Sequence, residues 1–227
     1  MTETAEQISI AVEGGPISAL LQAPAGAHAT LVLAHGAGAG MTHPFMAAIG
    51  HELVKRRIAT LRYQFPYMEQ GSKRPDPPQV AMAAARAAVA EASRRLPELP
   101  LFAGGKSFGG RMTSQAQAAK PLEGVRGLVF LGFPLHPAGR PSSERAEHLF
   151  SVRIPMLFLQ GTRDTLADMA LLEPIVARLG ERATLSLFGG ADHSFRAPAR
   201  NAAKTSLLPE IAQATAEWIE RTISAGG

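Results

Sequence analysis

The sequence of 227 residues contains no cysteine, which excludes disulfide bonds and thiolate metal sites. It also lacks any apolar run near the roughly 18 residues that a membrane-spanning helix needs. The opening stretch, MTETAEQISI, has neither the basic nor the apolar region of a signal peptide. We therefore expect a cytoplasmic protein with no membrane partner.

Clustered positive charge is lacking too, although the formal net charge is +4. The densest basic groups are Lys55-Arg56-Arg57 and Arg94-Arg95. Each stands at the expected end of a helix, where cations interact favourably with the helix dipole. Because no basic stripe with interleaved aromatic residues is present, nucleic acid is not an expected partner.

The residues that are present suit one well-buried domain spanning the whole chain. Apolar residues make up 46% of it, and 22 glycines and 17 prolines are spread along its length. Short β-type runs alternate with helical runs, which predicts an α/β fold with a mostly parallel central sheet and helices on both faces. The predicted strands are Ile8–Val12, Ile17–Ala23, Thr30–Ala34, Ile58–Arg62, Leu99–Ala103, Val125–Phe133, Met156–Gln160 and Ala183–Phe188. The predicted helices are Pro44–Arg57, Pro78–Leu96, Phe108–Lys120, Ala167–Leu179 and Ala202–Ile223, and a Pro-rich loop is expected over Phe65–Pro77.

The loop after Leu99–Ala103 contains the pattern G-x-S-x-G as Gly105, Ser107 and Gly109. A serine there sits on a strained strand-to-helix turn with its hydroxyl exposed, and side chains at the flanking glycines would clash. The following helix points its N-terminus at the site, which favours developing negative charge. Ser107 is therefore the candidate nucleophile.

Gly105-Lys106-Ser107 also resembles the end of a phosphate-binding loop, G-x-x-x-x-G-K-[ST]. That motif requires glycine at position 100, where the chain has Pro100. Residues 101–103 would then cradle phosphate, yet they read as the end of a strand. The phosphate-loop alternative is therefore disfavoured.

Asp164 follows the strand Met156–Gln160, at a position that suits the acid of a catalytic triad. Asp168 is expected inside or capping the next helix, and Asp192 adjoins the candidate base, while Asp76 precedes the nucleophile in a Pro-rich loop. Taken alone, Asp164 is as well explained as a helix cap.

His193 stands in the Gly-rich loop after the last predicted strand, where a general base would be placed. Of the seven histidines, it is the one that follows both Ser107 and Asp164 after a late strand. The three residues together are stronger evidence for a catalytic site than any one of them, because each follows a different strand. We predict Ser107, Asp164 and His193 as a catalytic triad.

The loop His35-Gly36-Ala37-Gly38-Ala39-Gly40 lets backbone approach a substrate closely. We expect the amides of Ala37 and Phe108 to form an oxyanion hole, and His35 to hydrogen-bond the loop. A dinucleotide fingerprint is disfavoured, because Met41 replaces its last glycine and no acid follows at the required distance. No cofactor and no metal are expected.

Further residues are expected at the walls of the cleft. Arg62 and Tyr63 follow one strand, and His136 follows another, so we predict these as substrate contacts. For Arg62 a structural ion pair is the stronger alternative. The segment of about 135–153 is placed where hydrolases insert a lid, and it is short enough to leave an open cleft.

Several stretches along nearly the whole chain resemble one protein family. They are HGAGAGMTHPFM, LRYQFPYMEQG, GGKSFGGRM, GLVFLGFPLHPAGRP, LFLQGTRD and GGADHSF. They are similar to the bacterial α/β-hydrolase family related to testis-expressed protein 30 and to the hydrolase-like domain of a non-specific-lethal chromatin complex subunit. More distantly they resemble dienelactone hydrolases and small esterases. The resemblance implies the same triad and oxyanion donors, and it supplies no substrate; dienelactone hydrolases use a cysteine nucleophile that this chain lacks.

The expected activity is acyl transfer from a small ester or thioester to water, through an acyl-enzyme. Carboxylesterase, thioesterase, lactonase and peptidase remain open. The alternative from another class is a non-catalytic binding module on the same fold. Serine reactivity separates the two.

Overall fold

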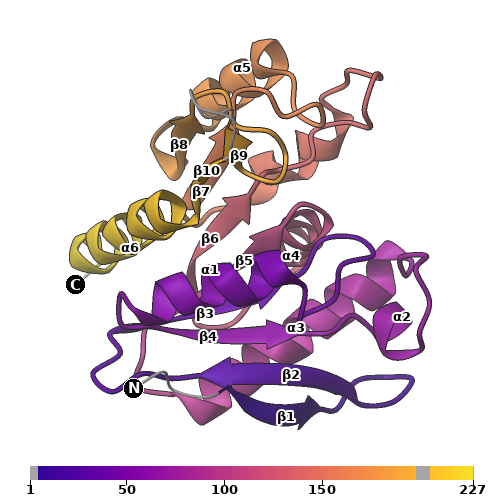
Figure 1. Ribbon diagram of the computed structural model, residues 1–227, viewed down its shortest axis with the longest axis vertical. Helices are drawn as coiled ribbons and strands as arrows, with labels where there is room; N and C mark the ends of the chain where they lie inside the picture. The colour runs from indigo at the N-terminus through magenta and orange to yellow at the C-terminus, as the bar shows by residue number, and fades with distance from the viewer. Residues whose placement is uncertain (1–4, 198–204, 227) are drawn as a thin grey trace.

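The computed structural model describes residues 5–197 and 205–226, and it centres on one eight-stranded sheet (Figure 1). The strand order is β1-β2-β4-β3-β5-β6-β7-β8. β1 (Glu6–Ile10) and β2 (Ile17–Gln22) form an antiparallel hairpin, and β2 pairs antiparallel with β4 (Ile58–Tyr63). All other pairs in this sheet are parallel, so the predicted mostly parallel sheet is confirmed.

The remaining strands of the sheet carry the loops that matter for the site. They are β3 (Ala29–Ala34), β5 (Leu101–Lys106), β6 (Val125–Leu131), β7 (Met156–Gly161) and β8 (Ala183–Phe188). β3, β4 and β7 are buried along their whole length, whereas the edge strand β8 is only partly buried. Burial on both faces explains the continuous apolar runs of the central strands.

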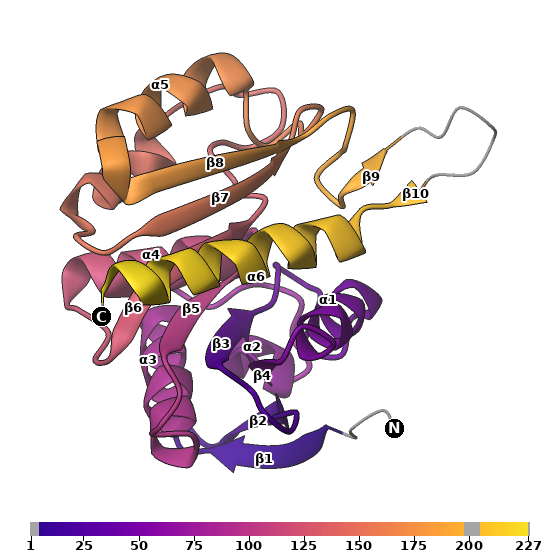
Figure 2. The same ribbon diagram turned by 90° about the vertical axis from the view of Figure 1, so that its left-hand side faces the viewer.

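Helices cover both faces of the sheet (Figure 2). α1 (Pro44–Val54) and α6 (Leu208–Ala225) contact each other and pack on one face. The elements on the other face are α3 (Pro78–Arg95), α4 (Phe108–Ala119), α5 (Met169–Leu179) and the 3-10 helix η1 (Glu144–Ser151). Each face thus has its own apolar core, with the sheet between them.

Some boundaries differ from the prediction. The predicted loop Phe65–Pro77 contains a short helix, α2 (Pro66–Glu69). The closing helix begins at Leu208 rather than at Ala202, which lies outside the described residues. A small antiparallel pair, β9 (Arg196–Ala197) with β10 (Thr205–Ser206), precedes α6 and was not predicted. Two-residue strands carry too little periodicity to be read from a sequence.

The predicted lid-like segment of about 135–153 packs on the body of the protein. Ala146 and Leu149 of η1 are fully buried in the core that also contains α4. Ser114 of α4 and His148 of η1 are 2.8 Å apart, Oγ to Nε2. These contacts hold η1 against α4, on the helical face that α4 covers.

Candidate active site

The turn between β5 and α4 presents Ser107 in a strained conformation. Ser107 has φ 50° and ψ −116°, a region that residues with a side chain rarely occupy. The turn packs so closely on the end of β3 that its glycines have no room for a side chain. A Cβ on Gly109 would lie 2.5 Å from the carbonyl oxygen of Ala34, and one on Gly105 would lie closer still. The predicted steric need for both glycines is confirmed, and the atom they make room for is the last carbonyl of β3.

Ser107 immediately precedes α4, so the Phe108 amide is the first of that helix. The first N–H groups of a helix have no acceptor within it, and they carry the positive end of its dipole. The loop that contains Ala37 follows β3, which pairs directly with β5. Ala37 and Ser107 line the same cleft. The two predicted oxyanion donors therefore belong to loops at the carboxyl ends of neighbouring strands.

Side chains from the β4 end hold the Ala37 loop in shape. The Gly38 amide donates to the Tyr67 hydroxyl at 2.9 Å, and the Met41 amide donates to Gln64 Oε1 at 2.8 Å. The sequence analysis did not identify Tyr67 and Gln64 as residues that support this loop. Their only signal was their place just after a predicted strand.

His35 is a structural residue, as predicted. Its Nε2 accepts from the Phe65 amide at 3.1 Å, and Nδ1 donates to the Gly36 carbonyl at 2.8 Å. The ring is fully buried. Burial lowers the pKa of His35 to about 4, so the imidazole is neutral near neutral pH.

Asp164 accepts hydrogen bonds at both carboxylate oxygens. Oδ1 accepts from the Leu166 amide at 2.8 Å, and Oδ2 accepts from Gln160 Nε2 at 2.6 Å and from His193 Nδ1 at 2.7 Å. Burial acts to raise the pKa of Asp164, but the hydrogen bond and charge of His193, with the Leu166 amide and the charge of Lys106, outweigh it and hold that pKa below its ordinary value. Asp164 is thus a fixed carboxylate that orients the His193 ring.

The alternative interpretation was that Asp164 caps α5. Asp164 does not cap that helix. Asp168 caps that helix instead, with its Oδ1 accepting from the Ala170 amide at 2.9 Å. This agrees with the expectation for Asp168.

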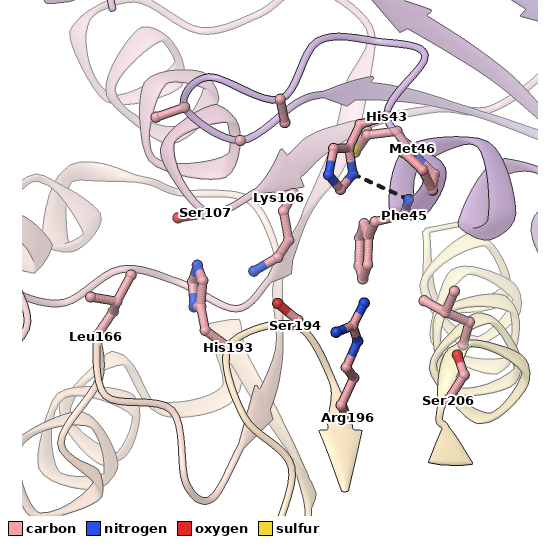
Figure 3. A pocket seen from close by; sticks show the side chains of 15 residues that line it. His43, Phe45, Met46, Lys106, Ser107, Leu166, His193, Ser194, Arg196 and Ser206 are labelled. Atoms are coloured by element: carbon pink, nitrogen blue, oxygen red, sulfur yellow. Dashed lines mark hydrogen bonds between the residues drawn. The ribbon is translucent and has the colours of Figure 1, made fainter. Parts of the chain in front are cut away.

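His193 stands in a tight loop shaped by its neighbour. Asp192 Oδ1 accepts from the amides of Ser194 at 2.8 Å and Arg196 at 3.0 Å. In Figure 3 the His193 imidazole points toward the Ser107 hydroxyl. The structure therefore places Ser107 and His193 on one cleft, with His193 Nδ1 turned to Asp164.

Gln160, the last residue but one of β7, was missed by the sequence analysis. It is fully buried, donates to Asp164 Oδ2 and accepts from the Phe133 amide at 3.0 Å. It thereby ties the acid to the end of β6. The available signal was a polar residue at the end of an otherwise apolar strand, MLFLQ.

Ser107 and His193 open into a cleft of about 870 Å³. Its wall comes from the loop after β3, the start of α1, the loop after β7 and the segment from β8 to α6. The lining residues are Gly36, Ala37, Ala39, His43, Pro44, Phe45, Met46, Lys106, Ser107, Leu166, His193, Ser194, Arg196, Ser206 and Leu208. Within residues 5–197 and 205–226, no cluster of side chains could hold a metal ion.

The three predicted substrate contacts lie outside this cleft, and these predictions need correction. Arg62 is buried beside α1, where its guanidinium donates to Gln22 Oε1 at 2.9 Å. Tyr63 is buried against Phe65, with ring centroids 5.2 Å apart. β4 is covered by helices on both faces, so side chains at its end point into the two cores.

His136 is also structural. Its Nε2 accepts from the Asp168 amide at 2.9 Å, and its Nδ1 donates to the Pro137 carbonyl at 2.9 Å. The ring joins the loop after β6 to the start of α5. No residue of the segment 135–153 lines the cleft, so that segment does not cover Ser107 in this structure.

The sequence matches the family described as alpha/beta hydrolase domain over residues 27–220. The chain belongs to the alpha/beta hydrolase domain family. Its strand order and mostly parallel sheet agree with this, and the predicted α/β-hydrolase fold is confirmed. No described helix is both long enough and apolar enough to cross a membrane.

Several solved hydrolase structures share the fold of this family member. A dienelactone hydrolase from Anabaena variabilis is 22% identical with a TM-score of 0.77, over 97% of this chain and 99% of that one. XC6422 from Xanthomonas campestris, described as a serine hydrolase without lid, is 20% identical with a TM-score of 0.74, over 97% and 96%. Est1E from Butyrivibrio proteoclasticus is 15% identical with a TM-score of 0.71, over 96% and 99%. At these identities the likeness establishes the fold alone.

Proposed function

We propose that this alpha/beta hydrolase is a serine hydrolase that cleaves a small carboxylic ester or thioester through an acyl-enzyme. The observation that carries the proposal is the 2.7 Å hydrogen bond from His193 Nδ1 to Asp164, in a cleft that also exposes Ser107. A buried carboxylate on Nδ1 fixes the tautomer that leaves Nε2 free to accept a proton. Such an arrangement activates a serine that is otherwise a weak nucleophile.

In the proposed reaction His193 Nε2 takes the Ser107 proton as the serine oxygen attacks the substrate carbonyl. The negative oxygen of the tetrahedral intermediate accepts hydrogen bonds from the Phe108 and Ala37 amides. Collapse of the intermediate breaks the ester bond, and His193 returns the proton to the leaving alcohol or thiol. A water molecule then hydrolyses the acyl-Ser107 by the same steps in reverse order.

The cleft favours a small substrate with an apolar portion. Its volume of about 870 Å³ is within the range of about 300–1,000 Å³ typical of small-molecule sites. Phe45, Met46, Leu166 and Leu208 supply apolar wall. Two of the similar structures are described as a dienelactone hydrolase and a serine hydrolase, which supports ester chemistry without choosing a substrate.

Two finer assignments belong to the same proposal. The quoted motifs support a place in the branch related to testis-expressed protein 30 and the non-specific-lethal complex subunit. The absence of cysteine is compatible with a reducing compartment, which supports a cytoplasmic location. A small-molecule ester is the proposed partner.

A fluorophosphonate probe tests the activated serine directly. Intact-mass measurement of the wild-type protein is expected to find one adduct, and Ser107→Ala to find none. Ser114→Ala is the matched control, because Ser114 is a buried serine of α4, and that variant is expected to label like the wild type. Absence of any adduct on folded wild-type protein would contradict the proposal and favour a non-catalytic binding module.

A panel of p-nitrophenyl esters and matching thioesters then defines the substrate class. Acetyl, butyryl and octanoyl members differ only in the length of the apolar acyl chain. We expect turnover of the short members and its loss in Ser107→Ala. Labelling by the probe without turnover of any member would point to a lactone or an amide as the substrate.

A further inference from the structure

A buried amine lies behind the candidate triad and takes no part in the steps proposed above. Lys106 immediately precedes Ser107, and its stem runs beneath Gly36, whose Cβ position is 3.5 Å from Lys106 Cγ. Its Nζ is fully buried and has no hydrogen-bond partner among the described residues. In Figure 3 it points from the end of β5 toward His193 and Ser194.

The amine converges with the Asp164–His193 pair around Gly132. A Cβ on Gly132 would lie 3.0 Å from Lys106 Nζ, 3.4 Å from His193 Nδ1 and 3.5 Å from Asp164 Oδ2. Gly132 has φ 72°, a conformation suited to glycine. All three polar atoms therefore surround the space that this missing side chain leaves open.

Two aromatic rings complete the surroundings of the amine. Lys106 Nζ lies 5.7 Å from the centroid of Phe45 and 5.5 Å from that of Phe195. Ring faces attract a cation at such distances. The site can thus carry an ammonium even though no carboxylate forms a salt bridge with it in the described structure.

A lysine is an unfavourable choice if its only task is to fill this space. An unbranched apolar side chain would cover Gly36 and contact both rings without the cost of burying an amine. The presence of the charged group calls for a role in which the charge itself matters. Two groups on which it can act, Asp164 and His193, share the space around Gly132 with it.

We propose that Lys106 is a positioning residue of the hydrolase site, whose buried ammonium opposes protonation of the His193 ring and so keeps the base neutral into mildly acidic solution. This inference rests on the proposed function. A cation beside an imidazole disfavours the imidazolium, and weak screening in the protein interior strengthens the effect. Lys106 thereby offsets part of the stabilisation that Asp164 gives to the charged form of the base.

The charge of Lys106 is present over the pH range where it would be needed. Burial lowers the pKa of Lys106 to about 7, while the charges of Asp164 and Asp192 act to raise it. The amine is therefore an ammonium below neutrality, where a histidine base would gain its proton.

Other charged groups face the pair and must stay unchanged in a test. Asp192 and Arg196 belong to the His193 loop, and His43 lines the cleft from the start of α1. Lys106→Met keeps these groups and the length of the side chain while it removes the charge. Lys120→Met is the matched control, because Lys120 is an exposed lysine at the C-cap of α4.

The direct experiment is an NMR titration of the His193 imidazole, assigned by comparison with His193→Gln. In Lys106→Met we expect the midpoint to move to higher pH by about one unit. Lys120→Met is expected to leave the midpoint unchanged, and Lys106→Arg, which keeps the charge, to stay near the wild type. An unchanged or lowered midpoint in folded Lys106→Met would overturn the inference.

The acid limb of kcat/KM for a p-nitrophenyl ester is expected to move in the same direction, with KM unchanged. A purely space-filling role for Lys106 would leave this limb unmoved in Lys106→Met, whatever happens to the melting temperature. If Lys106→Met does not fold, Lys106→Gln carries the same expectation.

This test separates the two proposals, because the imidazole titration needs no turnover. A shifted midpoint in a protein that neither reacts with the fluorophosphonate probe nor hydrolyses an ester would support the role of Lys106 in the pair and contradict the hydrolase function. Normal turnover with an unshifted midpoint would do the opposite.

Discussion

Ser107 and Ser114 belong to the same strand–helix unit, and each is near a histidine from a distant segment of the chain. The Ser114–His148 contact is a well-formed hydrogen bond of 2.8 Å. The Ser114 hydroxyl also donates to the Arg111 carbonyl at 2.9 Å, which holds it within α4. Ser114 is fully buried, whereas Ser107 lines the cleft.

The histidines of the two pairs differ as much as the serines. His193 has a carboxylate, Asp164, on its Nδ1. His148 has the cation Arg111 nearby, and burial followed by this charge lowers the pKa of His148 to about 4. A close serine–histidine contact is therefore a poor sign of a catalyst; the acid behind the ring and access to substrate distinguish the candidate pair.

The largest expected effect separates the two serines. Ser107→Ala should reduce kcat/KM for an ester substrate by about 10⁴-fold or more, because the nucleophile is lost. Ser114→Ala should stay within about threefold of the wild type, since Ser114 only joins α4 to η1. Steady-state kinetics on both variants measure this difference, and comparable losses would mean that the choice of nucleophile is wrong.

Removing the charge of Asp164 makes the Ser107–His193 pair resemble the Ser114–His148 pair. Asp164→Asn keeps the size of the side chain but removes the charge that stabilises a protonated His193. We expect kcat to fall on the order of 10³–10⁴-fold. Asp168→Asn, in the cap of α5, is the control and should affect stability rather than kcat. Retention of most activity in Asp164→Asn would argue for a different acid.

The Ser114–His148 pair should make the free energy of unfolding depend on pH. The pKa of His148 is lowered in the folded state, so the folded protein binds this proton less readily than the unfolded chain does. Its contribution to stability is therefore lost as the pH falls from about 6.5, the unfolded value, toward about 4.

The difference between these two pKa values of His148 corresponds to at most about 3 kcal/mol of unfolding free energy, since one pKa unit is about 1.4 kcal/mol. His148→Gln should therefore lose less of its free energy of unfolding between neutral pH and pH 4 than the wild type does. His35, whose pKa is also lowered to about 4 by burial, leaves a similar remaining slope. Denaturant titrations at several pH values measure both, and parallel curves for wild type and His148→Gln would contradict the prediction.

The smallest effect concerns the residue that holds the acid. Gln160→Leu removes the hydrogen bond to Asp164 and leaves the buried Phe133 amide without its acceptor. We expect kcat to fall about tenfold and the free energy of unfolding to fall by about 1–3 kcal/mol. Gln117→Leu is a control of the same type, since Gln117 accepts from the Leu122 amide away from the cleft. It should lose stability with no change in kcat.

The sequence predicted the parts of the site that depend on chain order and strand ends. Ser107 and His193 could be found because each follows a strand and because parallel strands bring their carboxyl ends together. The two glycines beside Ser107 were readable because a steric rule ties them to the turn. Asp164 could be chosen because few other aspartates compete for its place.

The supports and walls of the site were less accessible, because they depend on contacts between distant segments. Gln160 and Tyr67 act through partners that local pattern does not specify. Arg62 was assigned to the cleft because it ends a strand, but at the end of a strand buried on both faces the side chain enters a core. The residues of β10 were expected in the closing helix. They form a strand instead because they pair with β9, a contact that local pattern does not specify.

The contact of Gly105 and Gly109 with the Ala34 carbonyl has a consequence for changing this protein by mutation. The loop that contains Ser107 and the end of β3 meet here mainly through backbone atoms, so a shorter neighbouring side chain would not make room for a larger residue at either glycine. Libraries aimed at new substrates should leave both glycines fixed and vary Phe45, Leu166 and Leu208, which border the same cleft from separate elements. In evolutionary terms, reaction and specificity can then drift independently within one small fold.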